Sequence, residues 1–429
     1  MMLCKLSAST ASLALMLVPL CAGSEITSNS SASTTTTHAR AVDIPNEYTY
    51  KLPDGFLSNE NYTFVNGTST PNDKHINDLF KKASDAPIIS FDPSFSKLVG
   101  NAEIKLVAER PHDQWTYEGG IWVPERDEIW TISSIVQSSA GKPSTVYTYH
   151  LTSGAVNKLN ASLPIINPNG GYYYNGKVYI GTYPSNSTYR GGIVSVDART
   201  LKVETVVNSY FGIEFDGIDD LTWANRGGKD YMYFTDLYIT PLAYPGTQPR
   251  PLLPAGVWRW DAQDEVLLPV LGRGDVNPNG IRVSPDHKSL YVTDSTALFF
   301  DIPKPAPPAG GSVASWLGPY ILRYDIDDEG FPVNKRVFGY VRRLIADGIH
   351  CDDAGRVWTG EGDGIVVRSP SGKVLGIFNQ SYFLKSNGEL DYMANFALAG
   401  DKVVVFAHER MYTIKLAQEV VNKNSSIVN

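Results

Sequence analysis

The most constraining feature of this sequence is a hairpin-like segment that occurs six times along the 429-residue chain. Each copy has a polar residue, one or two small residues, an apolar stretch, a polar turn and a second apolar stretch. The copies cover 118–133, 169–182, 219–235, 279–293, 347–359 and 395–406, and their starts lie 51, 50, 60, 68 and 48 residues apart. A period of about 40–50 residues with short strands is typical of β-propellers. The sequence therefore predicts an all-β, six-bladed β-propeller around a central channel.

Composition agrees with this fold. Aromatic residues make up 11% of the chain, and its 37 Gly and 27 Pro favour strands and turns over helices. The alternative, an irregular β-sandwich, would not explain six matching hairpins. We expect residues 103–109 to supply an outer strand that closes the ring. The predicted division is a signal peptide at 1–24, a low-complexity and N-terminal extension at 25–86 and the propeller at 87–429.

The first 24 residues have the order of a secretory signal. Lys5 precedes the apolar run LALMLVPL, and small residues follow at 22–24. This run is too short to span a bilayer, and no later segment is long and apolar enough to do so. We therefore expect a secreted, soluble protein with no membrane partner, which we predict to be a monomer.

Seven Asn-x-Ser/Thr sequons occur in the chain, and none of them has Pro in the middle. Behind a signal peptide such sequons accept glycans where they are exposed. The predicted acceptors are Asn29, Asn61, Asn66, Asn160, Asn186, Asn379 and Asn424.

Each of the six hairpins opens with an acidic or amide residue. The innermost strand of a propeller blade begins near one mouth of the channel, so these residues should converge there: Glu118, Asn169, Asp219, Asn279, Asp347 and Asn395. Converging carboxylates repel one another unless a cation or protons compensate, and oxygen ligands suit Ca²⁺. We predict a site for Ca²⁺ or another divalent cation. Capping of a strand start is the alternative for any one of them taken alone.

Four motifs give the chain a family resemblance: EGGIW at Glu118, NSYFGIEFDGIDDL at 208–221, PNGI at Pro278 and DGIHCDDAGRVWTGEGDGI at 347–365. In order and spacing they resemble the senescence-marker/gluconolactonase family, also called regucalcin-like, and most of all its secreted fungal lactonohydrolases. The resemblance covers about residues 103–413. It implies a propeller that holds one divalent ion, usually Ca²⁺, in its channel.

The resemblance also implies roles for particular residues. It assigns metal ligands to Glu118, Asn279 and Asp347, and the fourth position is usually the Asn of an Asn-Asp pair. Here that pair is Asp219-Asp220. Asp219 can still ligate Ca²⁺, but its added charge bears on substrate preference. Asp220 would orient its neighbour from behind.

We therefore expect a Ca²⁺-dependent hydrolase of a small lactone. The ion would polarise the lactone carbonyl, and Asp347 or Asp219 would accept the proton of an attacking water. The predicted substrate-binding residues are Asn169, Asp220, Asn395 and Trp316.

Two other functions stay open at this stage. Some fungal propellers that resemble this one serve secondary metabolism as cyclases of the hetero-Diels–Alder type, and fold alone does not fix function. A non-catalytic binding module is the third possibility. The sequence has no His-Glu-x-x-His zinc motif and no Gly-x-Ser-x-Gly elbow. Its net charge is −8 and it has no basic run, so nucleic acid is not an expected partner.

Overall fold

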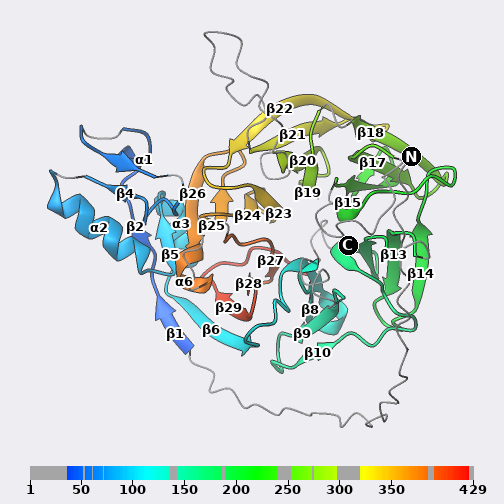
Figure 1. Ribbon diagram of the computed structural model, residues 1–429, viewed down its shortest axis with the longest axis horizontal. Helices are drawn as coiled ribbons and strands as arrows, with labels where there is room; N and C mark the ends of the chain where they lie inside the picture. Colours follow the sequence, from blue (N-terminus) through cyan, green and yellow to red (C-terminus); the bar gives the residue numbers. More distant parts are fainter. Residues whose placement is uncertain are drawn as a thin grey trace, which may run out of the picture. The chain divides into compact units, whose positions relative to one another are not determined.

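Six antiparallel blades stand around one centre in the described part of the chain, as Figure 1 shows. The structure is a computed structural model, and it describes residues 36–51, 54–59, 61–70, 72–135, 143–185, 189–238, 253–272, 275–296, 319–384 and 391–424. The predicted six-bladed propeller is confirmed. The expected signal peptide, the sequons at Asn29 and Asn186, and Trp316 lie outside the described residues.

Blades one to four each contain four strands in chain order. Blade one contains β7 (Glu118–Val123), β8 (Glu128–Ile132), β9 (Val146–His150) and β10 (Val156–Lys158), with the short helix η1 (Pro124–Arg126) between β7 and β8. Blade two contains β11 (Pro168–Tyr174), β12 (Lys177–Thr182), β13 (Gly192–Asp197) and β14 (Val203–Val207). Blade three contains β15 (Ile218–Arg226), β16 (Lys229–Asp236), β17 (Gly256–Asp261) and β18 (Val266–Gly272).

The remaining blades complete the ring. Blade four contains β19 (Pro278–Val283), β20 (Ser289–Asp294), β21 (Tyr320–Ile326) and β22 (Pro332–Tyr340). Blade five contains β23 (Ala346–Cys351), β24 (Val357–Glu361), β25 (Gly364–Arg368) and β26 (Val374–Asn379), followed by helix α6 (Gln380–Leu384). Blade six contains β27 (Phe396–Ala399), β28 (Lys402–Ala407), β29 (Arg410–Lys415) and β6 (Ala102–Glu109).

In each blade of a propeller the inner strand should be buried and the outer strand exposed, and the burial of these strands follows that pattern. All residues of the inner strands β11, β19 and β23 are buried, because neighbouring blades pack on both of their faces. The outer strand β22 is mostly exposed or half-buried. The six repeats therefore have their apolar and glycine-rich halves at the centre and their polar strands at the rim.

The ring is closed by strands from distant parts of the chain. As expected for residues 103–109, β6 pairs with β29, and Ile104 lies opposite Ile414. Outside β6 the sheet gains β1 (Thr36–Ala39), which is antiparallel to it. Closure therefore depends on pairing between an early strand and the last blade.

The N-terminal extension packs on blade five and belongs to the same compact unit as the propeller, residues 34–429. Strand β5 (Ile88–Ser90) pairs with β26, and β2 (Val42–Asp43) pairs with β5. The other elements are α1 (Glu47–Tyr50), β3 (Leu57–Ser58), β4 (Thr68–Ser69), α2 (Lys74–Ser84) and α3 (Pro93–Val99). Side-chain acceptors cap α2 and α3, since Asp73 and Asp92 each accept a backbone N–H of the first turn.

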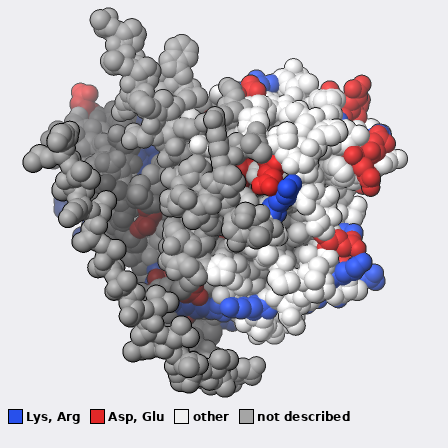
Figure 2. Space-filling model, turned by 45° about the vertical axis from the view of Figure 1, so that its right-hand side comes forward, with Lys and Arg blue, Asp and Glu red and all other residues white. Residues whose placement is uncertain are grey.

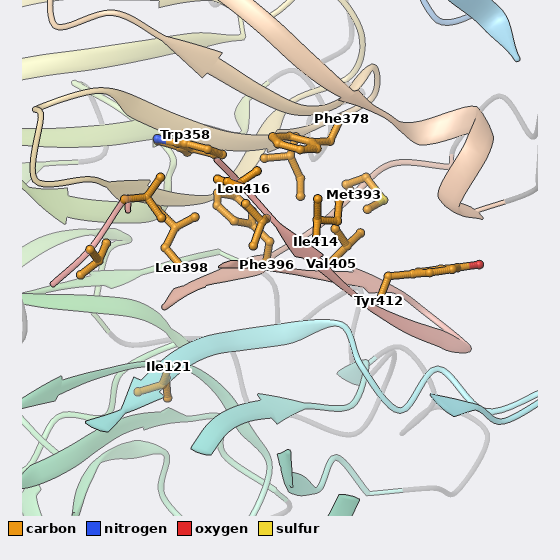
Figure 3. Packing of buried hydrophobic residues seen from close by; sticks show 14 of the residues in the cluster. Ile121, Trp358, Phe378, Met393, Phe396, Leu398, Val405, Tyr412, Ile414 and Leu416 are labelled. Carbon is orange, nitrogen blue, oxygen red and sulfur yellow. The ribbon is translucent and has the colours of Figure 1, made fainter. Parts of the chain in front are cut away.

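A large apolar cluster joins blades five, six, one and two (Figure 3). The Trp358 and Phe378 rings of blade five stack with their centroids 5.8 Å apart, and Phe396 of blade six lies beside Trp358. Ile121 brings blade one into the same cluster. This packing therefore fastens blade five to blades six and one.

One predicted glycan acceptor is wrong. Asn379 is fully buried at the end of β26, and its Nδ2 donates to the carbonyls of Ala83, Ser84 and Ala86. A glycan on this nitrogen would remove those bonds and has no room in the fold. The four other sequons within the described residues, Asn61, Asn66, Asn160 and Asn424, are exposed.

Charged residues are dispersed over the surface that Figure 2 draws. On that face, Lys and Arg side chains are interspersed with Asp and Glu in the described part of the chain. Among the described helices, none has the length and apolar character needed to cross a membrane.

Candidate active site at the channel mouth

The inner strands of blades two to five carry a β-bulge at the residue that the sequence singled out. In β11, Pro168 lies opposite Thr182 and Gly171 lies opposite Ile180, so two residues face one on the partner strand. The same shift occurs around Asp219, Asn279 and Asp347. A bulge breaks the alternation of side chains and re-aims them, and bulges are common beside active sites. The six opening residues are all buried: Glu118, Asn169, Asp219, Asn279, Asp347 and Asn395.

Glycine follows the opening residue where adjacent blades come into closest contact. A Cβ on Gly170 would lie 2.2 Å from the carbonyl oxygen of Asp219, and a Cβ on Gly280 would lie 2.2 Å from that of Asp347. A Cβ on Gly348 would lie 2.4 Å from the Asn395 side chain. Each bulge therefore rests directly on the site residue of the next blade, which fixes the spacing of the ring.

Neutral donors from blade two hold the Asp219 carboxylate. Asn169 Nδ2 and the Tyr183 hydroxyl both donate to Asp219 Oδ1. Tyr183 is fully buried directly after β12. Asp219 has no Lys or Arg partner among the ion pairs of the described residues. The hydrogen bonds to its carboxylate come from an amide and a phenol instead.

Glu118 is held in a similar way from blade six. Asn395 Nδ2 donates to Glu118 Oε2 at 3.1 Å, while Asn395 Oδ1 accepts the Phe396 N–H at 2.9 Å. His350 Nε2 lies 3.2 Å from the same Asn395 Oδ1, and burial lowers the pKa of His350 well below its usual value. A neutral His350 that donates this bond orients the Asn395 amide toward Glu118.

Asp347 has a tyrosine partner that the sequence reasoning missed. The Tyr392 hydroxyl donates to Asp347 Oδ2 at 3.0 Å, and the Tyr117 hydroxyl lies 3.1 Å from that of Tyr392. Asn279 also hydrogen bonds to Asp347. A usable signal was present, because Tyr392 lies three residues before Asn395 and Tyr117 directly precedes Glu118.

Burial and mutual repulsion make the three carboxylates hard to ionise together. Burial raises the pKa of Glu118 well above its usual value, and the charges of Asp347 and Asp219 raise it further. Burial and the Asp347 charge likewise raise the pKa of Asp219. Burial raises the pKa of Asp347 to about 7, although the Tyr392 hydrogen bond opposes the shift. The three groups therefore lie within electrostatic reach of one another, from three different blades.

Asp220 points to a different set of partners from those expected for a substrate ligand. Its carboxylate accepts the backbone N–H groups of Leu221 at 2.8 Å and Ile281 at 3.3 Å. It also pairs with Arg282 at 3.4 Å, and both side chains are 5% exposed. Arg282 in turn donates to the Ile349 carbonyl at 2.7 Å. Asp220 thus links blades three, four and five behind the bulges. That it binds substrate stays a prediction.

The carboxylate and amide oxygens at the channel mouth are of the kind that hard divalent cations prefer. In this structure, however, they do not lie close enough together to form a complete metal site. Within the described residues, no group of three or more His, Cys, Asp or Glu side chains stands close enough together to hold an ion. Amide and phenol donors hold the carboxylates instead. Their ligand atoms are nevertheless all oxygens and are buried, and no described Lys or Arg pairs with Glu118, Asp219 or Asp347. These are properties that fit Ca²⁺.

Known proteins resemble this chain in sequence and in fold. No protein-family model matches the chain. It is 25% identical over 327 residues to lactonohydrolase oryH of Aspergillus oryzae, and the match covers 60% of this chain and 66% of that protein, about two thirds of its length.

Two solved structures share the fold. A gluconolactonase from Xanthomonas campestris superposes with a TM-score of 0.57 at 20% identity, covering 77% of this chain and 95% of that one. A regucalcin from Agrobacterium tumefaciens, described as a calcium-binding protein, superposes with a TM-score of 0.50 at 15% identity, covering 76% and 96%. At these sequence identities, the two structures show only that the fold is shared. The chain is thus similar in sequence to a lactonohydrolase and shares the propeller fold of a gluconolactonase and a regucalcin.

Proposed function

We propose that this protein is a lactonase-like hydrolase that opens a small lactone at the channel mouth with the help of a divalent cation. The observation that carries the proposal is the set of three buried carboxylates, Glu118, Asp219 and Asp347, on separate blades and without a described cationic partner. The similarity to a lactonohydrolase supports the reaction class.

The ion in this proposal is Ca²⁺, and Glu118, Asp219, Asn279 and Asp347 are the residues that would hold it. When bound, it supplies Lewis-acid polarisation of the lactone carbonyl and stabilises the negative charge that develops on its oxygen. The calcium-binding description of the regucalcin with the same fold supports this choice. The all-oxygen donor set agrees with it.

Asp347 is the proposed general base. Its carboxylate accepts a proton from the attacking water while the water oxygen bonds to the lactone carbonyl carbon. The proton then passes to the ring oxygen as the C–O bond breaks, which gives a hydroxy acid. Without an ion, burial raises the pKa of Asp347 to about 7. A bound cation would favour the ionised carboxylate, which is the form that accepts a proton. Asn169 keeps Asp219 oriented beside it.

A panel of lactones of different ring size, followed by acid release in a pH-stat, tests the reaction. We expect at least one lactone to be opened with Ca²⁺ present and the rate to fall to background after EDTA treatment, with recovery when Ca²⁺ is restored. Hydrolysis of none of them would overturn the hydrolase, and EDTA-resistant hydrolysis would overturn only the role of the ion.

The raised pKa values also predict how stability depends on pH. Without an ion, the folded carboxylates bind protons more tightly than the unfolded ones, so the free energy of unfolding should fall as pH rises from about 4 through about 7. Bound Ca²⁺ competes with those protons and should raise stability most at high pH. Melting temperatures measured between pH 5 and pH 8, with EDTA and with CaCl₂, check this. Parallel curves with the same pH slope would contradict it.

Secretion is part of the same proposal. The order of residues 1–24 and the exposure of Asn61, Asn66, Asn160 and Asn424 support it. An N-terminal sequence of the protein from culture medium should begin after residue 20, and one that begins at Met1 would contradict it. The cyclase alternative gains no support from the relatives, so we carry it only as an outcome of the mutational test below.

A further inference from the structure

A cavity of about 290 Å³ lies between the N-terminal extension and blade five. Its described lining comes from α1, from the segment after β3, from the end of β22 and from β24 to β26. None of the six residues that open the inner strands contributes to it. The cavity is therefore separate from the channel mouth.

Aromatic side chains form much of its wall. Phe64 and Phe91 pack edge to face with ring centroids 5.8 Å apart, while Tyr50 and Tyr340 also line the cavity. Tyr50 is 70% exposed and Tyr340 is 60% exposed, so two large rings face outward at the same place. Such rings offer flat apolar surface to a ring-shaped ligand and a hydroxyl at the edge.

The charges in the cavity cancel in pairs. Arg368 and Glu361 form an ion pair at 2.5 Å with both side chains 2% exposed, and Arg342 pairs with Asp363 at 3.1 Å. The lining thus carries two positive and two negative groups. A charged ligand would find no unpaired counter-charge among the described lining residues, so a neutral one is favoured.

Two polar atoms of the lining residues have no hydrogen-bond partner among the described residues. Glu361 Oε1 accepts bonds from Thr359 and Arg368, whereas Glu361 Oε2 has no partner among the described residues. Arg342 uses Nε and Nη2 for Asp363 and the Tyr62 carbonyl, and within the described chain its Nη1 has no acceptor. One carboxylate acceptor and one guanidinium donor beside aromatic walls match a ligand that carries both kinds of group, as hydroxyls do.

We propose that this cavity binds a neutral, ring-shaped, polyhydroxylated molecule of the monosaccharide class. Its apolar ring face lies against Tyr340 and Tyr50, and its hydroxyl groups donate to Glu361 Oε2 and accept from Arg342 Nη1. The site is independent of the lactone chemistry at the channel mouth.

Isothermal titration of the full chain with D-glucose tests the site, after N-glycosidase treatment so that glycans on Asn61 or Asn66 do not compete. We expect saturable binding that Tyr340→Ala weakens roughly tenfold, because one aromatic contact is worth about that much. Tyr50→Ala should weaken it similarly. D-glucuronate, which keeps the pyranose ring but carries a carboxylate in place of the hydroxymethyl group, should bind at least tenfold more weakly than glucose.

Two variants serve as controls. Val337→Ala changes a residue of β22 that is 58% exposed and does not line the cavity, and it should leave binding unchanged. Asp347→Asn should also leave it unchanged, which separates this site from the channel mouth. Absence of saturable binding, or equal binding by wild type and both tyrosine variants with unchanged melting temperatures, would overturn the proposal.

Discussion

Asp347→Asn should lower kcat for lactone opening by roughly two to four orders of magnitude, the usual contribution of a general base. The amide keeps the size of the side chain and one oxygen that can ligate an ion, but it cannot accept the proton of the attacking water. Tyr392 can still donate to that oxygen, so the bulge and the fold should survive. Initial rates in a pH-stat and a thermal melt of the same preparation measure both expectations.

The matched control is Asp328→Asn. Asp328 is 86% exposed and pairs with Arg226 at the surface, so its loss should leave kcat within error of wild type. A cycloaddition catalyst needs no base to activate water, and in that case Asp347→Asn would barely slow the reaction. An active, folded Asp347→Asn enzyme would therefore refute the assignment of the base and favour the cyclase.

Gly280→Ala should damage both stability and activity. The new Cβ would lie 2.2 Å from the Asp347 carbonyl oxygen and 3.0 Å from Ile349 Cγ2, so blades four and five must separate. Overpacking of this kind costs about 1–3 kcal/mol of unfolding free energy. Because Asn279 and Asp347 flank the contact, a displacement of about 1 Å should also reduce kcat by roughly a hundredfold. Urea unfolding and lactone assays at saturating Ca²⁺ measure the two effects.

Gly272→Ala is the comparison for this effect. Gly272 ends β18, and the nearest atom to its added Cβ, Asp275 Oδ2, is 4.0 Å away. We expect its stability to stay within about 1 kcal/mol of wild type. If the two alanine variants unfold at the same urea concentration, close contact between blades does not set the geometry of the site.

The repeated hairpins were enough to predict the ring of blades, because each hairpin pattern is contained in one short continuous segment of the sequence. Each copy opens with a polar residue, which glycine follows directly in four copies. The structure puts five of these opening residues in inner strands and Asn395 directly before the sixth. The closing strand at residues 103–109 was likewise readable as an unpaired apolar segment ahead of the first repeat. For these features, the order of the repeats along the chain is also the order of the blades around the ring.

The contacts within the site were not local and could not be predicted in this way. Tyr183 and Tyr392 reach Asp219 and Asp347 from other blades, so their partners follow only from the stagger between neighbouring sheets. The bulges that re-aim these side chains break the alternation on which sequence reasoning relies. The predicted glycan at Asn379 was wrong for a related reason, because the helix that buries this residue lies nearly 300 residues earlier in the chain.

Pairing of β6 with β29 has a consequence for how the chain acquires its fold during synthesis. Glu109 and Arg410 hydrogen bond across that pair although they lie 301 residues apart. Hairpins in blades one to five can form as they leave the ribosome, but β6 must wait for the final blade while its edge stays open. Open strand edges invite pairing with other chains, and distant contacts form slowly. Ring closure should therefore be the last and slowest step of folding, and the nascent chain should be most vulnerable to aggregation just before it.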